Sequence, residues 1–157
     1  MFSARFSFGK EEGAAAMAVR RLVFVEEMGV PEQEEFDEFD AISAHLLVWD
    51  EEEAKPIAAG RLYPLHADLC IGHIAVTPAY RGQMFDDLVL RALLNRVDDL
   101  PGARVLIDAA AHEQKLCAPF GFLETGEEAF HRGAQRKRLA VDRDKIVWDS
   151  PCKHRKP

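Results

Sequence analysis

The stretch from residue 70 to residue 97 constrains the fold most, and it reads CIGHIAVTPAYRGQMFDDLVLRALLNRV. Residues 71–76 form a short apolar run rich in β-branched side chains, which predicts a buried strand that ends at Thr77-Pro78. A polar turn with Gly82 follows, and apolar residues then recur at helical spacing up to Val97. The order is therefore strand, basic turn and amphipathic helix. Because a helix start offers free N–H groups and the positive end of a dipole, this order suits a phosphate.

The sequence IAVTPAYRG before an amphipathic helix resembles motif A of the Gcn5-related N-acetyltransferases, the GNAT superfamily. The resemblance implies that the strand's backbone pairs with the pantetheine arm of acetyl-coenzyme A and that the turn's amides wrap its pyrophosphate. The cofactor-binding residues expected on this basis are Ile74, Ala75, Val76, Arg81, Gly82, Gln83, Met84, Phe85 and Asp86.

The turn departs from the common form of the motif, YRGxGxG, at two positions. Met84 and Asp86 stand where that form has glycine. Glycine lets a backbone approach a ligand closely, whereas a side chain obstructs the approach. Asp86 and Asp87 also place negative charge beside the expected polyanion, although acidic residues favour a helix start in their own right.

The stretch RRLVFVEEMGVPEQEEFDEFDAISAHLL resembles one GNAT subgroup, with R-x-x-V-F-V-x-E-Q-x-V-P, then E-x-D-x-x-D, then a histidine that opens the next strand. Met28 replaces the expected glutamine. The matching positions are Arg20, Val23, Phe24, Val25, Glu27, Val30, Pro31, Glu35, Asp37, Asp40 and His45. Charge patterning by itself instead favours a solvated, mobile loop for residues 32–40.

Apolar periodicity and turn residues predict the remaining elements around this unit. We expect strands at 2–8, 45–49, 56–62, 105–107 and 134–141, another strand starting at Phe122, and helices at 11–25 and 109–116. The strand at 105–107 would lie parallel to 71–76 through a right-handed crossover. The predicted fold class is α/β (α+β), a mixed central sheet flanked by helices in the GNAT acyl-CoA N-acyltransferase fold. We expect one domain at 1–145 and a C-terminal tail at 146–157.

Residues 116–122 resemble GNAT motif B, F-Y-x-x-x-G-F, with Leu116 and Cys117 in place of the two aromatic residues. In many family members that tyrosine protonates the departing coenzyme thiolate. Cys117 is therefore either a weak acid in its place or a small buried hydrophobic residue. Farther on, Arg136 replaces a histidine of the subgroup.

Three more side chains have both a chemical and a structural interpretation. Glu27 could deprotonate or hold an amine, or could simply be an acid at a helix end. His73 could be a base, or a hydrogen-bonded structural residue. Arg61 could bind an acidic group of the substrate, or could pair with the acidic residues 32–40. Strict alternation would place His73 on the same face as Ile71 and Ala75, with Cys70 opposite.

Composition excludes several classes of function. A length of 157 residues fits one domain, and a net charge of −7 argues against a nucleic-acid groove. The sequence shows neither a membrane span nor a signal peptide, so we expect a cytoplasmic protein whose three cysteines, Cys70, Cys117 and Cys152, are reduced. No metal is expected, because Leu116 stands where an H-E-x-x-H site starting at His112 would need its second histidine.

The resemblance implies an N-acetyltransferase that moves an acetyl group from acetyl-coenzyme A to a primary amine of a small molecule. The alternative is a catalytically degenerate GNAT-fold domain that acts as a binding or interaction module. The acidic loops favour a cationic amine. Homodimer formation fits the family, although the sequence shows no large apolar patch.

Overall fold

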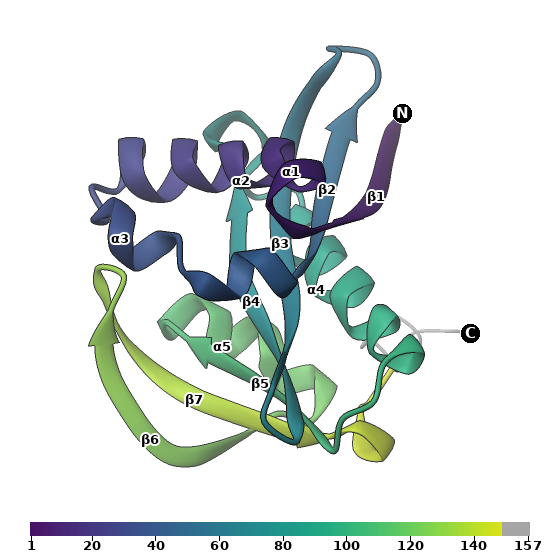
Figure 1. Cartoon of the computed structure of the whole chain (residues 1–157), viewed down its shortest axis with the longest axis vertical. Helices are drawn as coiled ribbons and strands as arrows, with labels where there is room; N and C mark the ends of the chain where they lie inside the picture. The colour runs from purple at the N-terminus through teal and green to yellow at the C-terminus, as the bar shows by residue number, and fades with distance from the viewer. Residues whose placement is uncertain (149–157) are drawn as a thin grey trace.

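The computed structural model describes residues 1–148 and is built around a seven-stranded sheet in the order β1-β2-β3-β4-β5-β7-β6 (Figure 1). The strands are β1 Phe2–Phe8, β2 Ala44–Asp50, β3 Lys55–Leu65, β4 Asp68–Val76, β5 Arg104–Ala109, β6 Leu123–His131 and β7 Ala134–Asp142. Neighbouring strands are antiparallel except β4 and β5, which are parallel as predicted. The predicted mixed sheet is confirmed.

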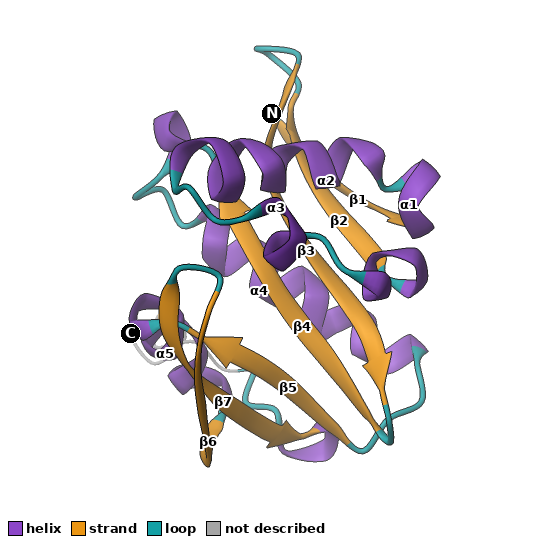
Figure 2. Ribbon diagram, turned by 60° about the vertical axis from the view of Figure 1, so that its left-hand side comes forward, coloured by secondary structure: helices purple, strands orange, loops and turns teal. Residues whose placement is uncertain are grey.

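Helices cover both faces of the sheet (Figure 2). They are α1 Gly9–Glu12, α2 Ala14–Arg20, α3 Glu32–Glu35, α4 Phe85–Arg96 and α5 Ala111–Cys117. The predicted helix at 11–25 is α1 and α2 followed by a π-helical segment, Arg21–Glu27. Ala16 and Val19 of α2 pack on one face of the sheet against Leu47 and Ala75.

The main core lies between the sheet and α4. Val89, Leu90, Leu93 and Leu94 of this helix are fully buried, and burial of each contributes about 1.5–3 kcal/mol. Close packing requires a glycine in β3, because a Cβ added at Gly60 would lie 2.8 Å from Cγ1 of Val89. The motif A helix is thus fixed tightly on the centre of the sheet.

The sheet splits between β4 and β5. These strands pair only at Leu69–Val105 and Cys70–Leu106, and beyond those pairs they diverge (Figure 2). In the same region the register of β4 with β3 shifts, from Ala75 opposite Ala59 to Gly72 opposite Arg61. Among residues 1–148, β5 pairs with β4 at no position beyond Cys70, so peptide groups on that side of β4 are available to a ligand.

The β4 bulge makes the predicted strict alternation wrong between Cys70 and His73. The φ of His73 is +51°, in the left-handed region, and Gly72 beside it has φ +152°. Because a bulge adds a residue to one strand, side chains beyond it change face. His73 therefore joins the face of Cys70, and both line one cavity, whereas Ile71 packs in the main core on the other face. Ala75 stays on the side of His73 as predicted, because Ala75 packs under α2 and Arg20 of α2 lies 3.2 Å from the His73 ring.

The expectation of a solvated loop at residues 32–40 is also wrong. This segment forms α3 and most of a 3-10 helix, Glu38–Ile42, and the side chains of Glu35 and Asp40 are completely buried. Buried carboxylates need charged or hydrogen-bonding partners, and arginines from distant segments supply them.

The start of the predicted tail lies against the domain. Ile146 packs on the main core, and the N–H of Val147 donates to the carbonyl of Phe120 at 2.9 Å. Residues 149–157, with Cys152 and the basic run 153–156, lie outside the described residues. Within residues 1–148, every helix is too short or too polar to cross a membrane.

Candidate functional site

A cavity of about 470 Å³ lies where β4 and β5 separate, next to the start of α4. Six of the nine residues expected to bind the cofactor line it: Ile74, Val76, Arg81, Gly82, Phe85 and Asp86. Ala75 instead packs among the apolar side chains under α2, and Gln83 bonds back to the carbonyl of Ala79 at 3.2 Å. The strand, the turn and the helix of the motif thus meet at one cavity.

At Met84 the turn has the left-handed backbone that glycine usually adopts. Met84 is the N-cap of α4 and has φ +67° and ψ +23°, a left-handed conformation that is uncommon for residues with a side chain. Gly82, two residues earlier, has φ +78°. The side chain of Met84 is mostly exposed, so no packing within the described residues explains its presence.

The N-terminal end of α4 is partly occupied by its own carboxylate. Asp86 Oδ1 accepts from the N–H of Asp87 at 2.8 Å, while the Asp87 carboxylate pairs with Arg91 at 2.7 Å. Asp86 also lines the cavity. One of the amides that a pyrophosphate would use therefore already has an anionic partner.

Arg81 bridges the mouth of this cavity. Its Nη1 and Nη2 contact the two carboxylate oxygens of Glu27 at 2.7 and 2.6 Å, and its Nε donates to the carbonyl of Val76 at 3.0 Å. The hydrogen bond from Arg81 lowers the pKa of Glu27, which makes this carboxylate a weaker base than usual. A general-base role for Glu27 stays a prediction. In the structure its carboxylate accepts two hydrogen bonds from Arg81.

Cys117 lies away from the cavity. It is completely buried in the main core, and burial raises the pKa of its thiol to about 12. The neighbouring Leu116 lines the cavity instead. The geometry agrees with the interpretation of Cys117 as a small buried hydrophobic residue.

A buried ion pair that the sequence analysis missed completes the lining. Glu113 of α5 and Arg136 of β7 are each about 4% exposed and meet at 2.9 Å. Glu113 also accepts from the N–H of Ala110 at 3.1 Å, which ties α5 to the end of β5. A signal was present, since a glutamate in the first turn of a helix commonly caps it, but the partner arginine is 23 residues away.

A second cavity, of about 360 Å³, lies on the face of Cys70 and His73. Arg61, Arg132 and Arg138 line it, together with Asp37 and Asp108. Both carboxylates are held by arginine forks: Asp37 by Arg61 at 2.7 and 2.8 Å, and Asp108 by Arg138 at 2.8 and 3.1 Å. This cavity shares no lining residue with the first.

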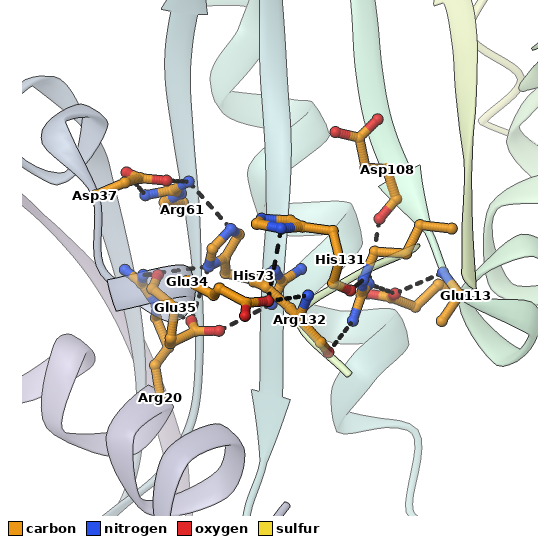
Figure 3. Close-up of polar contacts among 12 residues, drawn as sticks. Arg20, Glu34, Glu35, Asp37, Arg61, His73, Asp108, Glu113, His131 and Arg132 are labelled. Atoms are coloured by element: carbon orange, nitrogen blue, oxygen red, sulfur yellow. Dashed lines mark hydrogen bonds and ion pairs between the residues drawn. The ribbon is translucent and has the colours of Figure 1, made fainter. Parts of the chain in front are cut away.

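His73 is held by charged groups on both sides of its ring (Figure 3). Its Nδ1 lies 2.7 Å from Glu35 Oε2, and its Nε2 lies 3.0 Å from Nη2 of Arg61. Arginine only donates, so we assign Nε2 as the acceptor from Arg61 and Nδ1–H as the donor to Glu35. Nη2 of Arg20 also lies 3.2 Å from Nδ1, but it has the carbonyl of Glu35 as a closer acceptor, at 2.8 Å. Burial, and then the charges of Arg132 and Arg61, lower the pKa of His73, so the ring is neutral. The structural interpretation of His73 fits this geometry, because neither nitrogen is free.

Arg61 forms the salt bridges that the sequence predicted. Besides its fork on Asp37 it bonds Asp40 at 2.9 Å, and Asp40 in turn bonds Arg20 at 2.7 Å. Burial opposes ionisation of Asp40, but the hydrogen bonds and charges of Arg20 and Arg61 give it a net lowered pKa. A substrate-binding role for Arg61 stays a prediction.

The β6–β7 hairpin crosses the split in the sheet and reaches α3 (Figure 1). Its tip, Arg132-Gly133, has φ of +50° and +75°, the backbone of a tight hairpin turn. The N–H of Arg132 donates to Glu34 at 2.9 Å, and its Nη1 contacts Glu35 at 2.9 Å. Arg132 of the turn and Arg138 of β7 line the second cavity, whereas Ala134 and Arg136 of β7 line the first.

Comparison with known proteins identifies the family. Residues 19–97 match the family model described as an acetyltransferase (GNAT) domain. The chain belongs to the GNAT acetyltransferase family. The predicted GNAT fold and its assignment as an acyltransferase are thereby confirmed, and the first cavity lies at motif A.

Related proteins agree with this assignment. The chain is similar to YjcF of Bacillus subtilis, an uncharacterised N-acetyltransferase, with 28% identity over 121 residues, 77% of this chain and 85% of the relative. An acyl-CoA N-acyltransferase from Pseudomonas aeruginosa has the same fold, with a TM-score of 0.72, 24% identity, and 89% and 97% of the two chains covered. A GNAT acetyltransferase from Elizabethkingia anophelis, solved with acetyl-CoA bound, gives a TM-score of 0.68 at 14% identity over 90% and 97% of the chains.

Proposed function

We propose that this GNAT enzyme transfers an acetyl group from acetyl-coenzyme A to a primary amine of a small molecule. One observation carries the proposal: the cavity at the split combines free peptide groups of β4 with the N-terminal end of α4. Peptide groups in such a split suit the amide-rich pantetheine arm, and a helix start suits a pyrophosphate. Both parts of acetyl-coenzyme A thus find complementary groups in one cavity.

The backbone of β4 near the bulge would donate an N–H to the thioester oxygen and stabilise the charge that develops there. A neutral amine then attacks the carbonyl carbon, the carbon–sulfur bond breaks, and the nitrogen loses its extra proton to water. The leaving thiolate takes its proton from water, because the Cys117 thiol is buried outside the cavity lining. Glu27 acts by holding Arg81 at the mouth.

The alternative, a GNAT-fold binding module without catalysis, is favoured by the same loop. Met84 replaces a glycine in a left-handed position, Asp86 occupies an amide of α4, and Arg81 is bound to Glu27. Each feature opposes the binding of a pyrophosphate. Titration of the protein with acetyl-coenzyme A separates the two functions, since only the enzyme requires this ligand.

A matched pair of variants tests whether the loop is the cofactor site. Asp86→Asn removes a negative charge that lines the cavity, whereas Asp98→Asn removes one from an exposed residue after α4. We expect calorimetric titration to show severalfold tighter binding of acetyl-coenzyme A in Asp86→Asn and no change in Asp98→Asn. Equal affinities in both variants and the parent would place the ligand elsewhere, and absence of binding in all three would favour the module.

Catalysis is measured by mass-spectrometric detection of acetylated products from a panel of primary amines. We expect product from at least one amine, and coenzyme A release in equal amount. If acetyl-coenzyme A binds but every amine in the panel stays unmodified, small-molecule acetylation is wrong.

A further inference from the structure

We propose that the second cavity binds a carboxylate of the acceptor molecule. The Nε and Nη2 atoms of Arg132 would hold this carboxylate, so the acceptor belongs to the amino-acid class. This inference rests on the proposed function and names the substrate class of that reaction. It replaces the expectation of a cationic amine, because the acidic residues Glu35 and Asp40 are buried and already paired with arginines.

The guanidinium of Arg132 is buried but only partly used. Its side chain is 3% exposed, and it lines the second cavity. Nη1 contacts Glu35 at 2.9 Å, whereas Nε and Nη2 have no hydrogen-bond partner among residues 1–148. These two atoms are also absent from the set of fully enclosed unpaired polar atoms in the described chain, so they retain access to open space. A buried cation with free donors facing a cavity is a place for an anionic group.

The free edge has the geometry that selects a carboxylate. The N–H bonds of Nε and Nη2 point in parallel from one side of the planar guanidinium, and two carboxylate oxygens match them. The protein uses this same edge twice elsewhere. Arg138 holds Asp108 through Nε and Nη2 at 2.8 and 3.1 Å, and Arg104 holds Asp68 at 3.4 and 3.0 Å.

Charge in the second cavity favours an anion. Three arginines and two aspartates line it: Asp37 and Asp108 are each bound by an arginine fork, and the third arginine, Arg132, has its carboxylate partner, Glu35, outside the lining. Arg132 shares Glu35 with Arg20 and His73, so this one carboxylate serves three partners. A carboxylate on the acceptor would give Arg132 a second partner on the edge of the guanidinium that Glu35 does not contact.

The position of Arg132 also suits an acceptor. Arg132 lies at the tip of a hairpin whose residues line both cavities, and Ala134 and Arg136, which follow it in β7, line the first. Across the split, in β4, His73 lines the second cavity and the next residue, Ile74, lines the first. A carboxylate on Arg132 therefore anchors a molecule next to the proposed site of the thioester.

The experiment compares acceptors that differ only in the anionic group: L-phenylalanine and L-leucine against phenylalaninamide and leucinamide. We expect kcat/KM for acetylation to be at least tenfold higher for the carboxylates, because charge-assisted bidentate hydrogen bonds are strong. The carboxamides have the less basic amines, which are neutral in larger proportion, so intrinsic reactivity opposes this preference. Equal or better acetylation of the carboxamides would overturn the inference while leaving the proposed function standing.

The variant Arg132→Gln should bring the carboxylate-to-carboxamide ratio close to one, mainly through KM for the carboxylates. If Arg132 had only a structural role, the variant would lower kcat/KM for carboxylates and carboxamides alike. An unchanged ratio would therefore contradict the proposal. Arg104→Gln is the control, since it removes the same type of fork at a distant surface pair and should keep the parent ratio.

Binding without the cofactor separates this inference from the proposed function. Saturation-transfer NMR with L-phenylalanine and the free protein should show a signal that is lost in Arg132→Gln and kept in Arg104→Gln. If that signal is seen but acetyl-coenzyme A does not bind, the acceptor site stands and the acetyl transfer is wrong. If phenylalanine and leucine both bind no better than their amides, the carboxylate site is wrong.

Discussion

At the scale of single residues, the motif A turn has a left-handed backbone at a position where methionine stands in place of glycine. The backbone of Met84 is left-handed, at φ +67°, and its side chain is mostly exposed at the start of α4, where the neighbouring Phe85 and Asp86 line the cavity. A residue with a Cβ costs about 1 kcal/mol more than glycine in this region. The sequence indicated that Met84 was unusual, but only the structure shows that its backbone is the one that glycine prefers.

We therefore expect Met84→Gly to stabilise the loop and to tighten acetyl-coenzyme A binding severalfold, because it relieves the backbone and clears the approach of the ligand. Calorimetric titration measures the affinity for acetyl-coenzyme A. Met28→Gly is not a suitable control, because Met28 lines the cavity. Gln83→Gly is the better comparison, since it alters the adjacent position without touching a left-handed residue. Weaker binding in Met84→Gly would show that the methionine itself contacts the ligand.

At the scale of elements, α3 is fixed by charge more than by apolar packing. Glu35, its last residue, contacts Arg20, His73 and Arg132 and is completely buried. These partners come from α2, β4 and the β6–β7 turn, so one carboxylate joins segments on both sides of the split (Figure 3). Periodicity could not reveal this role, because a four-residue helix has no apolar stripe and its partners lie up to 97 residues away.

Removing that carboxylate should destabilise the protein strongly. We expect Glu35→Gln to lower the free energy of unfolding by about 3–5 kcal/mol, because it leaves buried arginines without their counter-charge. Glu32→Gln in the same helix removes only an exposed pair with Arg21 and should cost about 0–1 kcal/mol. Urea unfolding measures both, and similar losses in the two variants would contradict the assigned role of Glu35.

At the scale of the whole molecule, two buried neutral histidines make folding sensitive to acid. Burial is the main cause that lowers the pKa of both His45 and His73 from the usual 6.5. Below pH 6.5 the unfolded chain therefore binds protons that the folded chain does not. Stability from this source is complete above pH 6.5 and falls as the pH drops toward the lowered pKa values.

Each histidine should contribute a loss of at most about 1.4 kcal/mol per pH unit below 6.5. Urea unfolding at pH 7.5 and 5.5 measures the total, and His73→Asn should reduce the difference, since asparagine keeps a polar group and tolerates the left-handed backbone. An unchanged free energy of unfolding between the two pH values, in the parent protein, would mean that both rings take up protons with the same pKa in the folded and unfolded states.

The sequence by itself determined the elements and their family. Local apolar patterns and the motif A segment predicted the strands, the crossover helix α4, the parallel pair of β4 and β5, and six of the residues that line the first cavity. These features depend on neighbouring residues, so a linear pattern records them. The resemblance also identified the buried positions Arg20, Glu35 and Asp40 without giving their contacts.

Only the tertiary structure decided which charges are buried, which side chains face a cavity and where alternation fails. The bulge at His73 moved a side chain to another face, and the distant hairpin turn brought Arg132 to Glu35. Cys117 is buried in the core and does not line the cavity, although its place in motif B suggested a role as an acid there. Each outcome depends on desolvation and on partners remote in the chain, and neither quantity can be read from local sequence.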